Sequence, residues 1–220
     1  MSFFVDTNIP LGYTIIHDKY HDSSNNFITN NRNIFWSNLV QKEYTEKLDE
    51  IIDDIDIFLK LTEKILKRNT KDFSSYYIFE NYIIKRTKRC NLDKNKKQKI
   101  LKHFWVKYDI IEGISEHIYL NFKSFNENFK KMYFKRDKKL NHLLILHDCG
   151  LDNYLKYLEY TMQLKEWGIH SPDCKIIADA HDCGIAHDDL IFISNDEKML
   201  EIIANHDTSF LKIVEFTSCT

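Results

Sequence analysis

Short, almost continuously apolar runs constrain the fold of this chain more than any other feature. Residues 2–5 (SFFV), 34–36 (IFW) and 190–194 (LIFIS) lack the apolar-polar alternation of a strand with one solvated face. Strands that are apolar throughout are typical of a parallel sheet covered on both faces. Longer segments with helical spacing separate these runs. We therefore predict a single α/β domain over residues 1–220, in which helices sandwich a parallel β-sheet.

The spacing of apolar residues also predicts where the other elements lie. Helices are expected over residues 8–19, 38–68, 74–89, 94–120, 123–136, 151–167, 173–183 and 197–205, and further strands over 143–146 and 211–216. The polar stretch 21–33 is expected to be a loop. Leu155, Leu158 and Met162 share one face of their predicted helix, and Gly184 is expected to end the helix that Ser171-Pro172-Asp173 begins.

The middle of the chain is strongly basic, although the net charge of the whole is only −2. Residues 81–140 carry 17 Lys and Arg against 6 Asp and Glu. The basic helices over about 70–140 are predicted to be an insertion into the α/β core. A basic surface attracts nucleic acid through its phosphates, whereas in a Lys-rich chain it can also be a merely solvated face. The candidate RNA-binding residues are Lys85, Arg86, Lys88, Arg89, Lys96, Lys97 and Lys99.

Aromatic residues accompany this basic stretch. Stacking on bases is one interpretation, and packing in a helical core is the other. Residues open to both interpretations are Tyr76, Tyr77, Phe104, Trp105 and Tyr108, whereas Phe122, Phe125 and Phe129 are expected in the core.

Several classes of protein are disfavoured by the sequence. No apolar run approaches the roughly 20 residues that span a bilayer, and the N-terminus has no signal-peptide pattern. The five cysteines include no CxxC pair, which argues against a disulfide framework and a zinc ribbon. A reducing cytoplasm is the expected location.

Acidic residues follow or precede several of the predicted strands. Asp6 follows the first strand, Asp196 follows LIFISN, and Asp173 opens the helix before that strand. Glu43 lies two turns into the helix after IFW. Because ligands bind beyond the carboxyl ends of parallel strands, where the strand order reverses, these carboxylates are expected to converge. Clustered carboxylates suit Mg²⁺ or Mn²⁺, which can activate water and stabilise the leaving oxygen in phosphodiester hydrolysis.

The same residues carry a resemblance to a known family. The segments FFVDTNI, IFWS with Glu43 six residues later, SPDCKIIADA and IFISND resemble, in order, the motifs of PIN-domain nucleases. The resemblance covers residues 1–45 and 140–216. It implies Asp6, Glu43, Asp173 and Asp196 as catalytic, metal-binding residues. Asn8, Asp179 and Ser194 are expected as polar supports, and Asp182 stays an alternative member of the site.

The resemblance further implies a cytoplasmic Mg²⁺- or Mn²⁺-dependent endoribonuclease that acts on RNA. A homodimer and, in a toxin-type member, an antitoxin protein are the other partners it implies. The alternative is a non-catalytic PIN-like module that binds RNA or serves as a scaffold.

Two other patterns were weighed against this interpretation. His-Asp pairs are similar to those of the HD-type metal phosphohydrolases, but that family is all-helical and has no place for FFV and LIFIS. The repeated HDCG at 147–150 and 181–184 suggests a Cys/His zinc site, but the spacing fits no zinc-finger pattern.

Overall fold

The computed structural model describes residues 1–111 and 113–219, and these form two compact units. One unit combines Met1–Lys47 with Arg136–Thr220 and contains the sheet; the other is Leu48–Lys135 and is helical. The helical unit begins earlier than the range 70–140 expected from the charge, because the later part of one long helix belongs to it. None of the helices in the described residues is long and apolar enough to cross a membrane.

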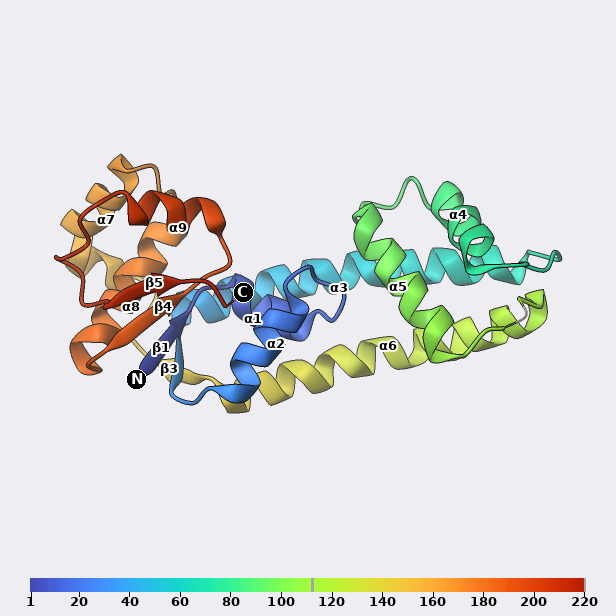
Figure 1. Ribbon diagram of the computed structural model, residues 1–220, viewed down its shortest axis with the longest axis horizontal. Coiled ribbons are helices and arrows are strands. Elements are labelled where there is room, and N and C mark those ends of the chain that lie inside the picture. The colour runs from blue at the N-terminus through green and yellow to red at the C-terminus, as the bar shows by residue number, and fades with distance from the viewer. Residues whose placement is uncertain (112, 220) are drawn as a thin grey trace. The chain divides into compact units, whose positions relative to one another are not determined.

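The sheet unit is built on five parallel strands (Figure 1). They are β1 (Ser2–Val5), β2 (Ile34–Ser37), β3 (Ile145–His147), β4 (Leu190–Ile193) and β5 (Glu215–Thr217), in the spatial order β3-β2-β1-β4-β5. All residues of β2 and β4 are buried, as expected for strands covered on both faces. The predicted parallel α/β fold is confirmed at this level.

The strand order reverses between β1 and β4. From β1 the chain adds β2 and β3 on one side, and then returns to add β4 and β5 on the other. Val5 of β1 pairs with Ile193 of β4, so Asp6 and Ser194 are the first residues beyond the two neighbouring strand ends. The sheet therefore offers its crevice at the position where two of the predicted acids follow their strands.

The helices of the sheet unit are α1 (Asn8–Thr14), α2 (His21–Asn30), the first part of α3 (Asn38–Lys67), the last part of α6 (Ser115–Leu143), the 3-10 helix η1 (Asn153–Tyr157), α7 (Leu158–Glu166), α8 (Asp173–Ala186) and α9 (Glu197–Ala204). Several of them begin close to the predicted positions, but α1 ends at Thr14 instead of residue 19 and α6 continues to Leu143 instead of ending at residue 136. The prediction of a loop over 21–33 is wrong, because α2 occupies most of it. Ile28 and Ser24 of this polar helix are buried, so tertiary packing stabilises a segment of low helix propensity.

Two further corrections concern α7 and α8. Leu155, Leu158 and Met162, expected on one face of a single helix, are divided between η1 and α7 and are exposed, with relative accessibilities of 49–57%. Gly184 does not end α8, which continues to Ala186. The final strand, predicted over 211–216, is shorter and lies at Glu215–Thr217.

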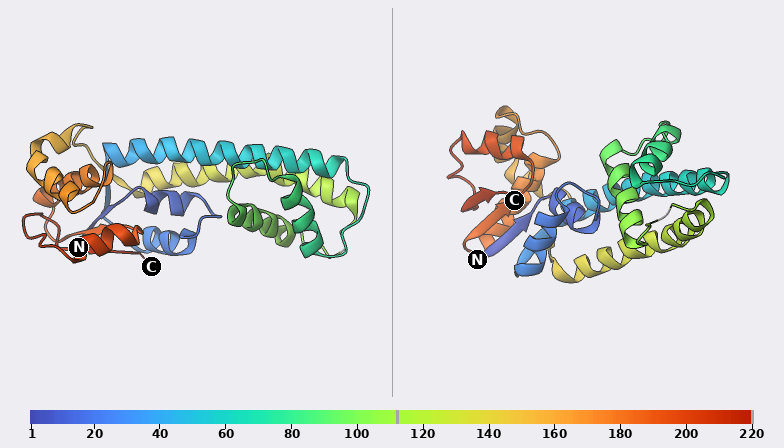
Figure 2. Two further views of the ribbon diagram at one scale, coloured as in Figure 1. Left: turned by 90° about the horizontal axis from the view of Figure 1, so that it is seen from above. Right: turned by 45° about the vertical axis from the view of Figure 1, so that its right-hand side comes forward.

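The helical unit contains α4 (Tyr76–Arg86) and α5 (Lys94–Lys107) together with parts of α3 and α6 (Figure 2). Its core is aromatic: Phe104 packs edge-on against Phe122 and Phe125, and Phe79 lies against Phe104. Phe122, Phe125 and Phe129 are buried as expected, and Phe104 is also core rather than a base-stacking residue. Polar contacts join α3 to α6, with Lys130 Nζ 3.1 Å from Asp56 and Asn126 Nδ2 2.7 Å from Glu63.

Candidate metal centre

Asp6 is the centre of a hydrogen-bonded cluster at the carboxyl ends of β1 and β4. The Thr7 backbone N–H donates to Asp6 Oδ1 at 2.6 Å. Asn8 Nδ2 and Ser194 Oγ donate to Asp6 Oδ2 at 2.6 and 2.8 Å. Three donors therefore orient this carboxylate, and the contacts expected of Asn8 and Ser194 as polar supports are present.

Neighbouring contacts tie the segment after β4 to the segment after β1. Asn8 Oδ1 accepts the Asn195 backbone N–H at 2.9 Å, and Ser194 Oγ accepts that of Asp196 at 3.1 Å. Asp196 is also the N-cap of α9, because its Oδ1 accepts the Met199 N–H at 3.0 Å. Capping holds one oxygen of Asp196 and leaves the acid half-buried beside the cluster.

Glu43 joins the cluster from α3 through a residue that the sequence did not single out. Thr7 Oγ1 donates to Glu43 Oε2 at 2.7 Å, and Lys47 Nζ lies 2.5 Å from Glu43 Oε1. Thr7 thus touches both Asp6 and Glu43. The sequence feature that could have identified the Lys47–Glu43 pair is its spacing of four residues, at which opposite charges pair on a helix.

Negative charge accumulates among these acids. The pKa of Asp6 is raised to about 7, chiefly by burial and also by the charges of Asp173 and Glu43, while the hydrogen bonds from Ser194 and Thr7 lower it. Burial likewise raises the pKa of Asp173, as do the charges of Glu43 and Asp196. Each of the four predicted acids thus acts electrostatically on at least one other. The structure brings Asp6, Glu43, Asp173 and Asp196 into one electrostatic cluster.

The chemistry of this donor set fits a hard divalent cation. All four candidate ligands are carboxylates, and hard oxygen ligands suit Mg²⁺ and Mn²⁺. The side chains as they stand engage other partners, and over residues 1–111 and 113–219 no three His, Cys, Asp or Glu form a group that could hold a metal ion.

Asp179 and Asp182 lie in a different polar cluster. Asn153 Nδ2 donates to the buried Asp179 at 3.1 Å. His147 Nε2 lies 2.9 Å from Asp182, which also accepts the Tyr157 hydroxyl. The contacts of Asp179 therefore do not support its expected role beside the four acids. Instead, Asp179 helps to join η1 to α8.

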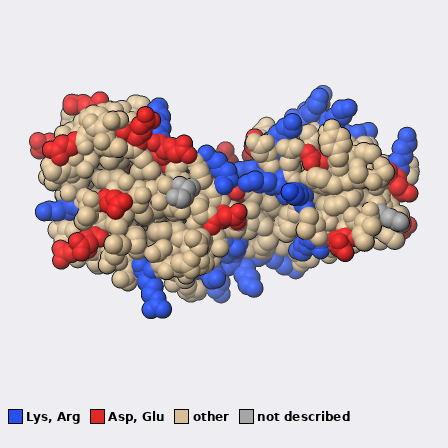
Figure 3. Space-filling model, viewed as in Figure 1, with Lys and Arg blue, Asp and Glu red and all other residues tan. Residues whose placement is uncertain are grey.

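The candidate RNA-binding residues belong to the helical unit, and one of them is wrongly predicted. Lys97 is buried, and its Nζ donates to the carbonyl oxygens of Thr87 and Cys90 at 3.0 and 2.9 Å. It caps the chain after α4 and cannot meet a phosphate. Lys85, Arg86, Lys88, Arg89 and Lys99 are exposed, and Lys96 is partly so. In Figure 3, Lys and Arg stand out over this unit, whereas Asp and Glu are frequent over the sheet unit.

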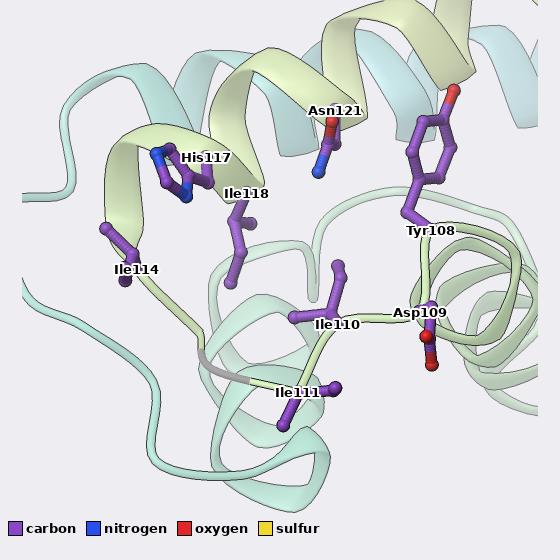
Figure 4. Close-up of a pocket in the computed structure, with 8 residues that line it drawn as sticks. All are labelled: Tyr108, Asp109, Ile110, Ile111, Ile114, His117, Ile118 and Asn121. Carbon is purple, nitrogen blue, oxygen red and sulfur yellow. The ribbon is translucent and has the colours of Figure 1, made fainter.

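The helical unit also holds a pocket of about 510 Å³, shown in Figure 4. Its lining is mainly isoleucine: Ile110, Ile111, Ile114 and Ile118. Tyr108, Asp109 and His117 are the titratable residues among the described lining. This pocket lacks a cluster of chemically active groups, so its size does not make it a candidate active site.

Comparison with models of known protein families, with curated proteins and with solved structures gave no match. The inference of function therefore rests on the residues and their arrangement.

The raised pKa of Asp6 predicts a pH-dependent stability in the absence of metal. Because the folded protein holds the Asp6 proton up to about pH 7 and the unfolded chain loses it near 3.8, stability should fall as the pH rises between these values and level off above 7. Between pH 5 and 7 this fall corresponds to about 3 kcal/mol. Urea unfolding in EDTA from pH 5 to 8 measures this fall, and Asp6→Asn should remove most of its Asp6-dependent part.

A matched control for this measurement is Glu201→Gln, which makes the same chemical change on an exposed position of α9. It should keep the wild-type slope. A slope that is equal in wild type and Asp6→Asn would show that Asp6 is already ionised well below pH 7 in the folded protein.

Proposed function

We propose that this protein is a metal-dependent endonuclease that hydrolyses phosphodiester bonds in RNA. The observation that carries the proposal is the meeting of Asp6, Glu43, Asp173 and Asp196, which come from four separate segments, at the crevice between β1 and β4. Burial, and after it the charges of the neighbouring acids, raise the pKa values of Asp6 and Asp173. A cluster of this kind is costly for folding and is best explained by a cation that it serves to bind.

Each part of the site has a distinct role in this proposal. The four carboxylates hold Mg²⁺ or Mn²⁺, and Thr7, Asn8 and Ser194 fix the orientation of Asp6 and Glu43 through the hydrogen bonds described above. When bound, the cation would polarise the phosphodiester and lower the pKa of water. Lys47 neutralises Glu43 while the site is without metal.

The exposed basic residues of the helical unit supply affinity for the phosphate backbone. Contacts of Lys and Arg with phosphates are independent of sequence and weaken steeply with salt. We propose RNA rather than DNA as the substrate because residues 1–45 and 140–216 resemble PIN-domain nucleases. The alternative is a non-catalytic RNA-binding module, in which the same basic surface would bind RNA.

Removal of metal tests the proposal directly. Wild-type protein is incubated with a labelled structured RNA, or with DNA of the same sequence, in Mn²⁺, Mg²⁺, Ca²⁺ or EDTA. We expect internal cleavage of RNA in Mn²⁺ and Mg²⁺ and none in EDTA, with activity restored when Mn²⁺ exceeds the chelator. Cleavage that persists in EDTA would exclude the carboxylate site as its source, and salt-sensitive binding without cleavage would favour the non-catalytic module.

A further inference from the structure

A second feature of the sheet unit adjoins the four acids: a pocket of about 210 Å³ into which two of them face. Asp173 and Asp196 line one part of it, and Met199, Ile169 and Ile202 form apolar walls. Lys198 and His170 complete the lining with groups that can donate hydrogen bonds to an anion. The pocket is therefore apolar inside and polar at the acids, the usual character of a small-ligand site.

Gly168 and Ile202 are part of the lining of this pocket. Gly168 follows the end of α7 with φ +98°, a conformation that favours glycine. A Cβ at this position would be in ordinary van der Waals contact with Ile202 Cδ1 at 4.0 Å, so Gly168 is explained by its backbone conformation rather than by lack of space. Met199 is held in place because its backbone N–H bonds to Asp196.

Lys198 adds a positive charge to the lining of the pocket. It is exposed and lies in the first turn of α9, where the helix dipole favours negative charge and disfavours positive charge. A phosphate beside the pocket would account for a lysine at this position. The lysine would also offset the repulsion between that phosphate and the carboxylates of Asp173 and Asp196.

We infer that this pocket receives one of the two nucleotides that flank the scissile phosphate, with its base against Met199 and Ile202 and its outer phosphate on Lys198. This inference rests on the proposed function, because we identify the ligand as a nucleotide from the position of the pocket next to the four acids. A space of this size holds part of one nucleotide unit rather than a folded RNA element. The pocket thereby selects the sequence at one position beside the cut.

Two variants and their controls test the pocket. Lys198→Ala removes the phosphate contact and Lys198→Arg retains the charge; Lys165→Ala removes an exposed lysine of α7 instead. Ile202→Phe fills the space opposite Gly168, and Ile185→Phe places the same ring at an exposed site on α8. Cleavage kinetics on a pool of RNAs randomised around the cut, and binding of a short single-stranded RNA in Ca²⁺ at several salt concentrations, are measured for each.

Lys198→Ala is expected to raise KM about 10-fold with kcat nearly unchanged, and to lower the slope of log affinity against log salt by about 0.7, the value for one lost phosphate contact on a single strand. Lys198→Arg should restore both. Ile202→Phe should alter the base preference at one flanking position without changing the salt slope. Both controls should behave as wild type.

The outcomes separate this inference from the proposed function. If the protein cleaves RNA with metal but the Lys198 and Ile202 variants behave like their controls, the inference about the pocket is wrong. The proposed nuclease function is then still supported. Absence of cleavage by wild type, with RNA binding that still depends on Lys198 and Ile202, would overturn the nuclease and retain the pocket as a nucleotide site. If neither binding nor cleavage depends on them, the inference is wrong.

Discussion

Asp6→Asn is expected to lower metal-dependent RNA cleavage roughly 100- to 1,000-fold, about 3–4 kcal/mol of transition-state stabilisation at 1.36 kcal/mol per factor of ten. The substitution preserves the size of the side chain and removes its charge. The three donors that contact Asp6 would face an amide whose nitrogen cannot accept their hydrogen bonds. We therefore expect weaker metal binding and a changed orientation of the neighbouring carboxylates.

The measurement is the single-turnover rate in Mn²⁺ over a range of metal concentrations, for wild type, Asp6→Asn and Glu201→Gln. Glu201→Gln removes a carboxylate charge from the exposed face of α9 and should cleave at the wild-type rate. Thermal unfolding of each variant verifies that the rates compare folded proteins. An Asp6→Asn rate within threefold of wild type would remove Asp6 from the catalytic residues and with it the proposed centre.

Gly184→Ala is expected to destabilise the protein by about 3 kcal/mol, although alanine is the better helix former. Gly184 lies inside α8, where replacing glycine by alanine usually stabilises a helix by up to about 1 kcal/mol. Here a Cβ would stand 1.8 Å from the carbonyl oxygen of Lys212. Backbone atoms cannot yield as a flexible side chain does, so α8 and the chain at residue 212 must move apart.

That movement would cost a specific contact as well. The Lys212 backbone N–H donates to His181 Nδ1 at 3.0 Å, one turn before Gly184 on the same helix. Chemical denaturation of Gly184→Ala measures the loss. Gly150→Ala is the comparison, because a Cβ there meets nothing within 4 Å and only the positive φ of 76° opposes it, for a cost of about 1–2 kcal/mol. A stabilised Gly184→Ala would show that this close approach is absent in solution.

The edge of the sheet at which Asp6 and Asp196 lie was predictable because it depends on strand direction. Once FFV and LIFIS are recognised as neighbouring parallel strands, Asp6 and Asp196 must emerge at the same edge of the sheet. Lys47 is similarly local, four residues from Glu43 on one helix. Thr7 was not singled out, since its contact with Glu43 joins residues 36 positions apart and has no periodic signature.

Other features contradict their local sequence signals. The polar segment at α2 has few helix-favouring residues and becomes a helix because buried positions such as Ile28 pack against its neighbours. Lys97 lies in a run of lysines that resembles a solvated basic face, yet its amine is buried and donates to the carbonyl oxygens of Thr87 and Cys90 after α4. Asp179 shares a helix with Asp173, but its orientation places it beside Asn153 instead of the four acids.

Sequence by itself determined the features that follow from periodicity and chain direction: the parallel sheet, the helical character of the segment from Asn38, the edge at which Asp6 and Asp196 lie, and the basic charge of the middle segment. Only the tertiary structure decided which of the basic side chains reach the surface, why Gly184 lacks a side chain, and that a pocket opens between Gly168 and Ile202. The physical reason is that these features depend on close contacts between segments distant in the chain, whose geometry no local pattern records.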